Sequence, residues 1–294
     1  MYNYICRLIN QIPILSVIPL VFILIMIIMW GTFEDNNADD VSLDAKQQEQ
    51  AAAPDVVAFA RGILSFDPDT RQAEILRSNA KRGILNCSRQ WGKTTLAAIK
   101  AIHRAQTVPG SLIIIATPTE RQSGEFLEKI RVLLTTVGIT PRGDGHNRLS
   151  IRFPNASRIV GLPGKHGNVR GFSRVSLMII DEAVWVPDAL YKSLRPMLAV
   201  GNGDLWIMST PQGKTGFFYE AWEYGGERWT RFKVPVTDCG RISEDFLKDE
   251  LQSLGTQCFR REYLCEFIDD AGGIFDRILI EQALDSTVEW LRLS

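Results

Sequence analysis

After residue 56, hydrophobic positions follow two patterns, and each predicts a different kind of element. Runs of consecutive apolar or β-branched residues predict strands covered on both faces, and these are residues 82–87, 111–117, 175–183, 204–210 and 227–236. Amphipathic stretches at 94–106 and 120–138 predict helices. Residues 148–153 and 157–162 alternate at period two around a Pro-Asn pair, which predicts a hairpin. Strands that alternate with helices predict an α/β fold with a doubly wound, mainly parallel sheet flanked by helices.

The chain begins with an apolar stretch that leaves two interpretations open. Residues 11–30 carry no charge, and at about 1.5 Å per residue they are long enough to span a membrane. They are either a transmembrane helix or a sign that translation starts later, at Met26 or Met29. The acidic residues that follow would place the rest of the chain outside the cytoplasm under the positive-inside rule. Of the two interpretations, a cytoplasmic protein with a mis-called start is the favoured expectation. The acidic residues 31–55 are predicted to be a disordered lead-in.

Composition narrows the class of protein only slightly. The net charge of −1 gives no general argument for or against nucleic-acid binding, so any such surface has to come from a local patch. The five cysteines are odd in number and contain no C-x-x-C pair, which indicates reduced thiols. The three histidines lack metal-ligand spacing.

The stretch NCSRQWGKTT (86–95) lies between a predicted strand and a predicted helix, which is the setting of a phosphate-binding P-loop, G-x-x-x-x-G-K-[ST]. Cysteine stands where the first glycine of the pattern belongs. Lys93 is expected to contact the β- and γ-phosphates of ATP, and the Thr94 hydroxyl to bind Mg²⁺. The expected phosphate-binding set is Cys87, Ser88, Arg89, Gln90, Trp91, Gly92, Lys93, Thr94 and Thr95.

A second G-K-T triplet, in PQGKTGFF (211–218), also follows a predicted strand. Its first-glycine position is Met208, inside that strand, so the chain has no loop long enough to surround a phosphate there. We interpret Lys214 as an ordinary loop lysine.

The segment LMIIDEA delivers two acids to the end of a buried strand, where ligands bind in sheets of this kind. Asp181 is expected to hold Mg²⁺, directly or through water, and Glu182 to orient the water that attacks the γ-phosphate. An acidic pair that merely caps a helix is the alternative. The P-loop about 90 residues upstream favours the catalytic interpretation.

Taken together, these motifs resemble the large terminase subunit of tailed bacteriophages, the motor that packages DNA into proheads. The resemblance runs from about residue 60 to residue 285 and includes SRQWGKTT and IIDEA. FDPDTRQAEIL is similar to the glutamine motif of that family, which implies that Gln72 recognises the adenine. WIMSTPQGKTGFFYE resembles its coupling segment, which implies that Ser209 and Thr210 link hydrolysis to movement. REYLCEFIDDAGGIF resembles the stretch that leaves the ATPase domain. In this family the first P-loop glycine is often replaced.

Two arginines are candidates for an arginine finger, a group that can accelerate phosphoryl transfer by about 10³-fold or more. Arg89 lies within the loop and could act in cis. Arg170 resembles the position from which family members contact a neighbouring subunit, which implies a homo-oligomeric ring. A structural ion pair or a contact to a DNA phosphate is the alternative for Arg170.

The segment 141–174 contains seven basic residues against one acidic residue. Such a patch could hold the backbone of double-stranded DNA without sequence preference, or it could be a solvated hairpin face. The basic residues are Arg142, Arg148, Arg152, Arg158, Lys165, Arg170 and Arg174.

The predicted division of the chain is an apolar segment (1–30), the lead-in (31–55), a P-loop ATPase domain (56–270) and a helical stub (271–294). In the resembled family a nuclease domain follows, and it needs several converging acids. The stub is too short to form one, so nuclease activity is not expected. The resemblance also implies a small terminase subunit and a portal as partners. A helicase-like ATPase, a membrane-anchored ATPase and a prophage remnant that binds nucleotide without turnover are the alternatives.

Overall fold

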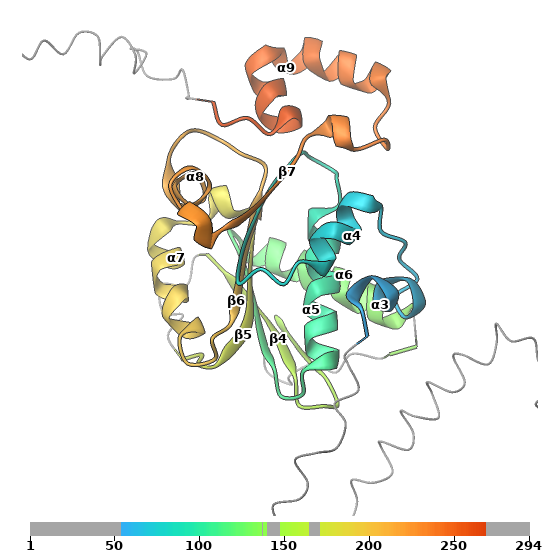
Figure 1. Ribbon diagram of the computed structural model, residues 1–294, viewed down its shortest axis with the longest axis vertical. Helices are drawn as coiled ribbons and strands as arrows, with labels where there is room; N and C mark the ends of the chain where they lie inside the picture. The colour runs from blue at the N-terminus through green and yellow to red at the C-terminus, as the bar shows by residue number, and fades with distance from the viewer. Residues whose placement is uncertain (1–53, 137, 140–147, 165–170, 269–294) are drawn as a thin grey trace, which may run out of the picture. The chain divides into compact units, whose positions relative to one another are not determined.

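A computed structural model of the chain describes residues 54–136, 138–139, 148–164 and 171–268 (Figure 1). The strands are β1 (Arg82–Cys87), β2 (Leu112–Thr117), β3 (Ser150–Arg152), β4 (Arg158–Pro163), β5 (Val175–Asp181), β6 (Asp204–Ser209) and β7 (Thr230–Val234). The α-helices are α3 (Val56–Gly62), α4 (Thr70–Arg77), α5 (Lys93–Thr107), α6 (Glu120–Thr135), α7 (Asp188–Leu194), α8 (Gly216–Glu223) and α9 (Glu244–Leu264). Short 3₁₀ helices are η3 (Ala183–Trp185), η4 (Arg195–Leu198), η5 (Gly226–Arg228) and η6 (Val236–Asp238).

Within the described residues, the strands form one sheet in the order β3-β4-β2-β5-β6-β1-β7. The pairing of β3 with β4 is antiparallel, and every other neighbouring pair is parallel. Strand β6 therefore lies between β1, which leads into the P-loop, and β5, which ends in the acids. The carboxyl ends of β1, β5, β6 and β7 all meet at one edge of the sheet, where ligands bind in folds of this kind.

Both faces of the sheet are covered by helices, which explains the unbroken apolar runs in its strands. Figure 1 shows α3, α4, α5 and α6 on one face and α7 and α8 on the other. Successive residues of one strand pack into different cores: Ile113 and Ile115 join the first core, and Ile114 joins the second. Each such side chain, fully buried, stabilises the fold by about 1.5–3 kcal/mol.

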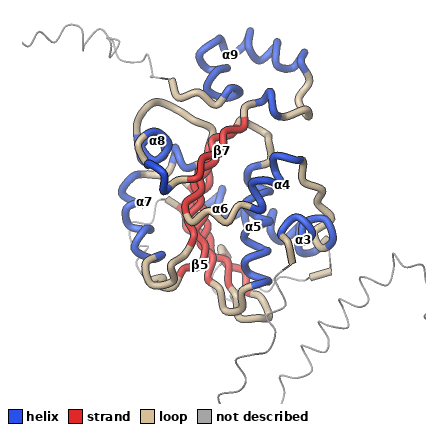
Figure 2. Tube along the Cα trace, viewed as in Figure 1, coloured by secondary structure: helices blue, strands red, loops and turns tan. Residues whose placement is uncertain are grey.

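Helix α9 lies beyond the carboxyl end of β7 (Figure 2). Gly255 interrupts it with a non-helical backbone (φ 74°, ψ 164°), so that α9 consists of two helical pieces. The second piece carries Glu262 and Tyr263, both buried. The tertiary contacts of α9 near the sheet therefore come from its carboxyl-terminal half.

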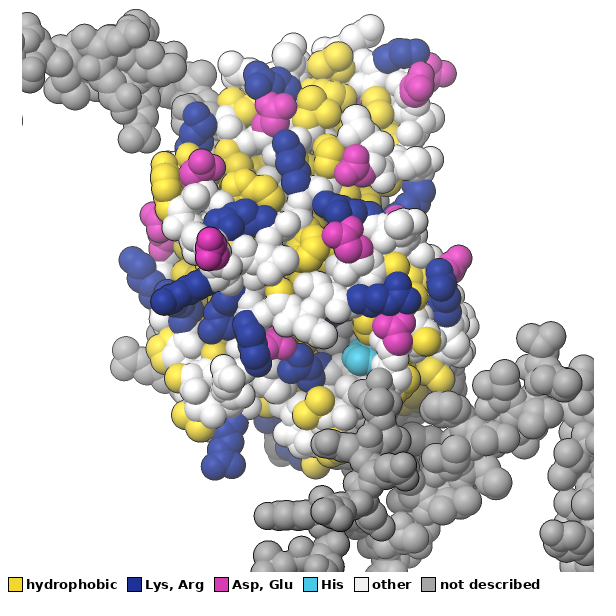
Figure 3. Space-filling view, in the orientation of Figure 1, with side chains coloured by type: hydrophobic (Ala, Val, Ile, Leu, Met, Phe, Trp, Pro, Cys, Tyr) yellow, Lys and Arg dark blue, Asp and Glu magenta, His cyan; other side chains and the backbone are white. Residues whose placement is uncertain are grey.

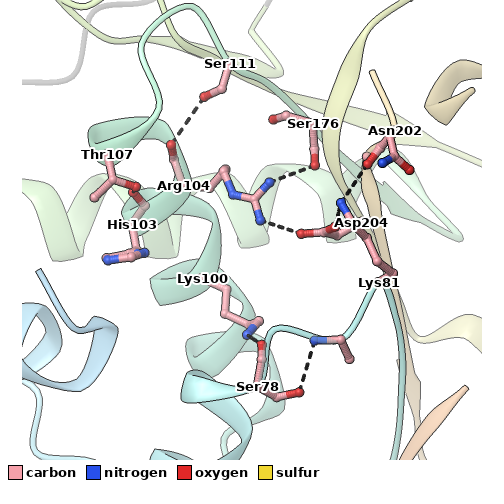
Figure 4. Close-up of polar contacts among 12 residues, drawn as sticks. Ser78, Lys81, Lys100, His103, Arg104, Thr107, Ser111, Ser176, Asn202 and Asp204 are labelled. Atoms are coloured by element: carbon pink, nitrogen blue, oxygen red, sulfur yellow. Dashed lines mark hydrogen bonds and ion pairs between the residues drawn. The ribbon is translucent and has the colours of Figure 1, made fainter. Parts of the chain in front are cut away.

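At the opposite edge of the sheet, polar contacts attach α5 to the starts of two strands (Figure 4). The Arg104 guanidinium donates to the Ser176 carbonyl oxygen at 2.9 Å and pairs with the Asp204 carboxylate at 2.5 Å. Lys81 pairs with the second oxygen of that carboxylate at 3.0 Å. Because α5 begins at the P-loop, this network fixes the far end of the helix that presents the loop.

The predicted strands, helices and hairpin are confirmed, with shifted ends. The helix expected over 120–138 ends at Thr135, because Gly138 adopts a left-handed backbone (φ 75°) and donates to the Thr135 carbonyl. The strand expected over 175–183 ends at Asp181, because Glu182 is also left-handed.

The structure describes no helix that is both long and apolar enough to cross a bilayer. The predicted apolar segment 1–30, most of the lead-in and the stub 271–294 lie outside the described residues. The described part of the lead-in ends in Asp55, whose carboxylate accepts from the Ala58 N–H and caps α3.

Candidate nucleotide-binding site

The expected P-loop is the turn of residues 88–92 between β1 and α5. Gln90 and Gly92 have positive φ angles of 57° and 99°, so they provide the left-handed turns of the loop. Trp91 is fully buried in the core beneath it and anchors the loop. Cys87 is the last residue of β1 and pairs in register with Val234 of β7. The first-glycine position is therefore extended strand, which explains why cysteine is tolerated there.

Helix α5 begins directly at this loop without a side-chain cap. Its N-cap residue is Gly92, so no side chain satisfies the first N–H groups of the helix. Lys93, Thr94 and Thr95 form its first turn. A helix start of this kind, at the carboxyl edge of a parallel sheet, is well suited to bind phosphate.

Two contacts join the loop to the acids after β5. The Lys93 ammonium lies 2.8 Å from the Glu182 carboxylate. The Thr94 hydroxyl donates to an Asp181 carboxylate oxygen at 2.9 Å. Since β6 separates β1 from β5 in the sheet, these contacts span the end of β6. The structure thus brings together four residues that the sequence predicted to act in one site.

Burial and charge set the protonation of this group. Burial raises the pKa of Asp181 above its usual value, and the nearby Lys93 opposes that rise. Burial alone would lower the pKa of Lys93, but the neighbouring acids Glu182 and Asp181 raise it instead. Burial also raises the pKa of Cys87 to about 12, so this thiol is neutral at pH 7. The site therefore holds a charged lysine against two acids.

Glu182 is held in a strained conformation. Its φ of 51° is left-handed, which is unusual for a residue other than glycine and costs of order 1–3 kcal/mol. The Glu182 N–H donates to the Asp181 carboxylate at 2.9 Å and supports this turn. As a result the carboxylates of two consecutive residues both point to the P-loop, one to Lys93 and one to Thr94.

The two residues expected to couple hydrolysis to movement, Ser209 and Thr210, lie at the end of β6, between the loop and the acids. Both are buried. The Ser209 hydroxyl accepts from the Val184 N–H at 3.5 Å, two residues after Glu182. This hydrogen bond connects the end of β6 to the turn that follows Glu182.

Gln72 lies against the P-loop and is 2% exposed. Its side-chain oxygen accepts from the Asp69 N–H at 3.1 Å, which completes a capping box at the start of α4. Its amide nitrogen donates to the Trp91 carbonyl at 3.2 Å. Gln72 thus joins α4 to the loop.

Arg89 of the P-loop contacts helix α9. The Arg89 guanidinium pairs with the buried Glu262 carboxylate of α9 at 2.6 Å, and the backbone N–H of Arg89 donates to the Glu262 backbone carbonyl at 3.2 Å. The bond to Glu262 raises the pKa of Arg89 further, although burial works against the charge.

Arg170 lies outside the described residues, as do Arg142 and Lys165 of the predicted basic patch. Figure 3 shows Lys and Arg interspersed with Asp and Glu over the visible face.

The chain leaves this region across three strand ends. The Asn86 amide of β1 donates to the Cys265 carbonyl at 3.0 Å, and the Cys265 thiol donates to the Val234 carbonyl of β7 at 3.2 Å. The Ile268 N–H donates to the carbonyl of Gln212, which follows β6. Phe267 packs against aromatic rings of α8, with Tyr219 at 5.1 Å between ring centroids. We call residues 265–268 the exit segment.

Three contacts near the P-loop were not predicted from the sequence. They are made by Glu262 with Arg89, by Asn86 with Cys265 and by Arg241 with Asp69. The Arg241 guanidinium pairs with Asp69 at 2.6 Å and reaches the space over the loop. No periodic pattern marks any of the three, because each acts through a contact far away in the sequence. As predicted, the first-glycine position of the second G-K-T triplet, Met208, lies inside β6.

Comparison with known proteins gives consistent matches. The family model described as the N-terminal part of the T4-like terminase large subunit matches residues 84–282. The large terminase subunit of Thermus virus P23-45 is 28% identical, over 69% of this chain and 46% of that protein. The chain thus spans about half the length of the curated relatives that it matches.

Solved structures agree on the fold. The large terminase ATPase domain of Thermus phage P74-26 has a TM-score of 0.61 at 25% identity, over 71% of this chain and 97% of that one. The large terminase of bacteriophage HK97 has a TM-score of 0.63 at 15% identity, over 74% and 55%. A large terminase from a thermophilic bacteriophage, in complex with ADP, has a TM-score of 0.56 at 15% identity, over 72% and 52%. At these identities, the last two support the P-loop NTPase fold alone.

Proposed function

Because the chain belongs to the terminase large-subunit family, we propose that it is an ATP-hydrolysing motor domain that moves double-stranded DNA during phage packaging. The observation that carries this proposal is the pair of contacts that join Lys93 to Glu182 and Thr94 to Asp181. They bring Lys93, the lysine proposed to bind phosphate, and two acids together around one helix start. The terminase of the thermophilic bacteriophage binds ADP, and ATP is the substrate that we propose here.

In this proposal Lys93 and the first N–H groups of α5 hold the β- and γ-phosphates. Glu182 orients the attacking water, and its present partner Lys93 would turn to the phosphates when ATP binds. Cys87, Ser88, Gln90, Trp91, Gly92 and Thr95 shape or line the loop. The Gln72 side chain makes two hydrogen bonds within the protein. Its amide can form further hydrogen bonds, and these contact the adenine.

The residues also fit a magnesium ion. The hydroxyl of Thr94 and the carboxylate of Asp181 lie 2.9 Å apart, and oxygen donors of this kind bind Mg²⁺ together with phosphates and water. When bound, Mg²⁺ neutralises charge on the β- and γ-phosphates. Asp181 is 5% exposed, so few water molecules can reach its carboxylate.

Coupling to movement would run through Ser209 and Thr210, because the Ser209 hydroxyl contacts the turn that carries Glu182. Arg89 and Arg170 are the proposed arginine fingers, Arg89 in cis and Arg170 from a neighbouring subunit of a homo-oligomeric ring. Arg89 would first have to leave Glu262. A small terminase subunit and a portal are the proposed partners.

The test is ATP turnover by the full chain with and without linear double-stranded DNA, with the assembly state recorded by sedimentation. We expect turnover that rises with DNA and is lost in Lys93→Ala. Nucleotide binding without turnover, even in assemblies with DNA, would contradict the motor and favour a remnant. Strand separation during turnover would favour a helicase-like ATPase instead.

A further inference from the structure

Two side chains from distant parts of the sequence lie over the P-loop glycine that precedes the lysine. A Cβ atom placed on Gly92 would lie 3.3 Å from the Gln72 amide nitrogen and 3.9 Å from an Arg241 guanidinium nitrogen. Gln72 belongs to α4, and Arg241 belongs to the segment between η6 and α9. The space over Gly92 is therefore bordered by an amide and a guanidinium group.

Arg241 is held in this place by an ion pair. One guanidinium nitrogen lies 2.6 Å from the Asp69 carboxylate. The other oxygen of that carboxylate accepts from the Gln72 N–H at 2.8 Å and caps α4. Because Asp69 binds both groups, it sets the positions of Arg241 and Gln72 together.

The two groups differ in how much surface they offer. Gln72 is almost completely buried, whereas the Arg241 side chain is 51% exposed. A flat, charged guanidinium group that is held at one nitrogen and belongs to a half-exposed side chain can stack on an aromatic ring. Lys93 and Thr94 turn toward the acids after β5, so the phosphates belong on that side. The Arg241 guanidinium near Gly92 is therefore available to the base of a nucleotide.

We propose that Arg241 is a further nucleotide-binding residue, whose guanidinium contacts the purine ring of ATP. This inference rests on the proposed ATP site and adds a residue from outside every motif of the sequence. Asp69 orients the guanidinium, and the Gln72 amide lies beside it next to Gly92. In this proposal Arg241 contacts the base, and the P-loop binds the phosphates.

The experiment compares two ligands by calorimetry: ATP, and inorganic tripolyphosphate, which has the phosphates without the base. Arg241→Ala should weaken ATP binding by between about 2-fold and about 30-fold and leave tripolyphosphate binding unchanged. Lys93→Ala should weaken both ligands. Arg61→Ala is the matched control, since Arg61 is similarly exposed (56%) and forms an ion pair with Asp67 at 2.7 Å.

Arg241→Lys keeps a positive charge for Asp69 but loses the flat group, so it should also weaken ATP selectively, and it decides the matter if the alanine variant does not fold. Unchanged ATP binding, or an equal loss for ATP and tripolyphosphate, would overturn the role of Arg241 alone. A wild-type chain that binds neither ligand would overturn the proposed function, and this inference with it.

Discussion

Arg89 of the P-loop and Glu262 of α9 are joined twice, through a side-chain pair at 2.6 Å and a backbone hydrogen bond at 3.2 Å. Glu262 is 5% exposed, and a second arginine, Arg261, lies 3.5 Å from its carboxylate. The loop that is proposed to hold the phosphates is thereby attached to the last helix of the described chain.

Arg89→Ala should lower both stability and turnover. Loss of the partly exposed ion pair should reduce the free energy of unfolding by about 1 kcal/mol, which lowers the Tm by about 2–4 °C. If Arg89 acts on the phosphates, Glu262→Gln should release it and leave kcat at least as high as in the wild type. The same loss of kcat in both variants would mean that the pair has only a structural role.

The two G-K-T triplets allow a matched comparison. Lys93→Ala should reduce ATP turnover by about 100-fold or more, because the lysine stabilises charge that develops on the phosphates. Lys214→Ala, in the same triplet after β6, should stay within about 2-fold of the wild type. Steady-state phosphate release measures both. A similar loss for Lys214 would contradict its interpretation as an ordinary loop lysine.

Lys100 should make stability depend on pH. Its ammonium group donates to three carbonyls at the end of α4 and lies over the Trp206 ring, and burial lowers its pKa to about 7. The unfolded chain keeps this proton up to about pH 10.4, so between these values it binds more protons than the folded chain. Stability should therefore rise with pH from about 7 to about 10.

Urea unfolding at pH 7, 8 and 9 measures this effect. Lys100→Met should flatten the rise, whereas Lys129→Met, at an exposed lysine of α6, should keep it. A rise that persists unchanged in Lys100→Met would assign the pH dependence to other groups.

Cys87 should be chemically inert in the folded protein. It is fully buried, and its raised pKa of about 12 keeps the thiolate population very small at pH 8. Iodoacetamide followed by peptide mass spectrometry should modify Cys258, which is partly exposed, well before Cys87. Labelling of Cys87 at the rate of Cys258 without denaturant would show that the loop opens.

Much of the fold was predictable because strand and helix periodicities are local. The runs around Ile114 and Ile179 predicted buried strands, and the order of the sheet brought Lys93 to Glu182 as the motifs implied. The partners of Arg89 were not predictable, since Glu262 lies 173 residues further along the chain. The end of β5 depended on the backbone of Glu182, which no hydrophobic pattern encodes.

The exit segment has a mechanical consequence. Its hydrogen bonds attach it to the end of β1 through Asn86, to the end of β7 through Val234 and to the chain after β6 through Gln212. Tension on the exit segment would therefore be divided among the ends of β1 and β7 and the segment that follows β6. The end of β1 leads directly into the P-loop, and the end of β6 carries Ser209 and Thr210, the residues proposed to couple hydrolysis to movement. A force on the exit segment and a shift of the P-loop would thus act on the same backbone.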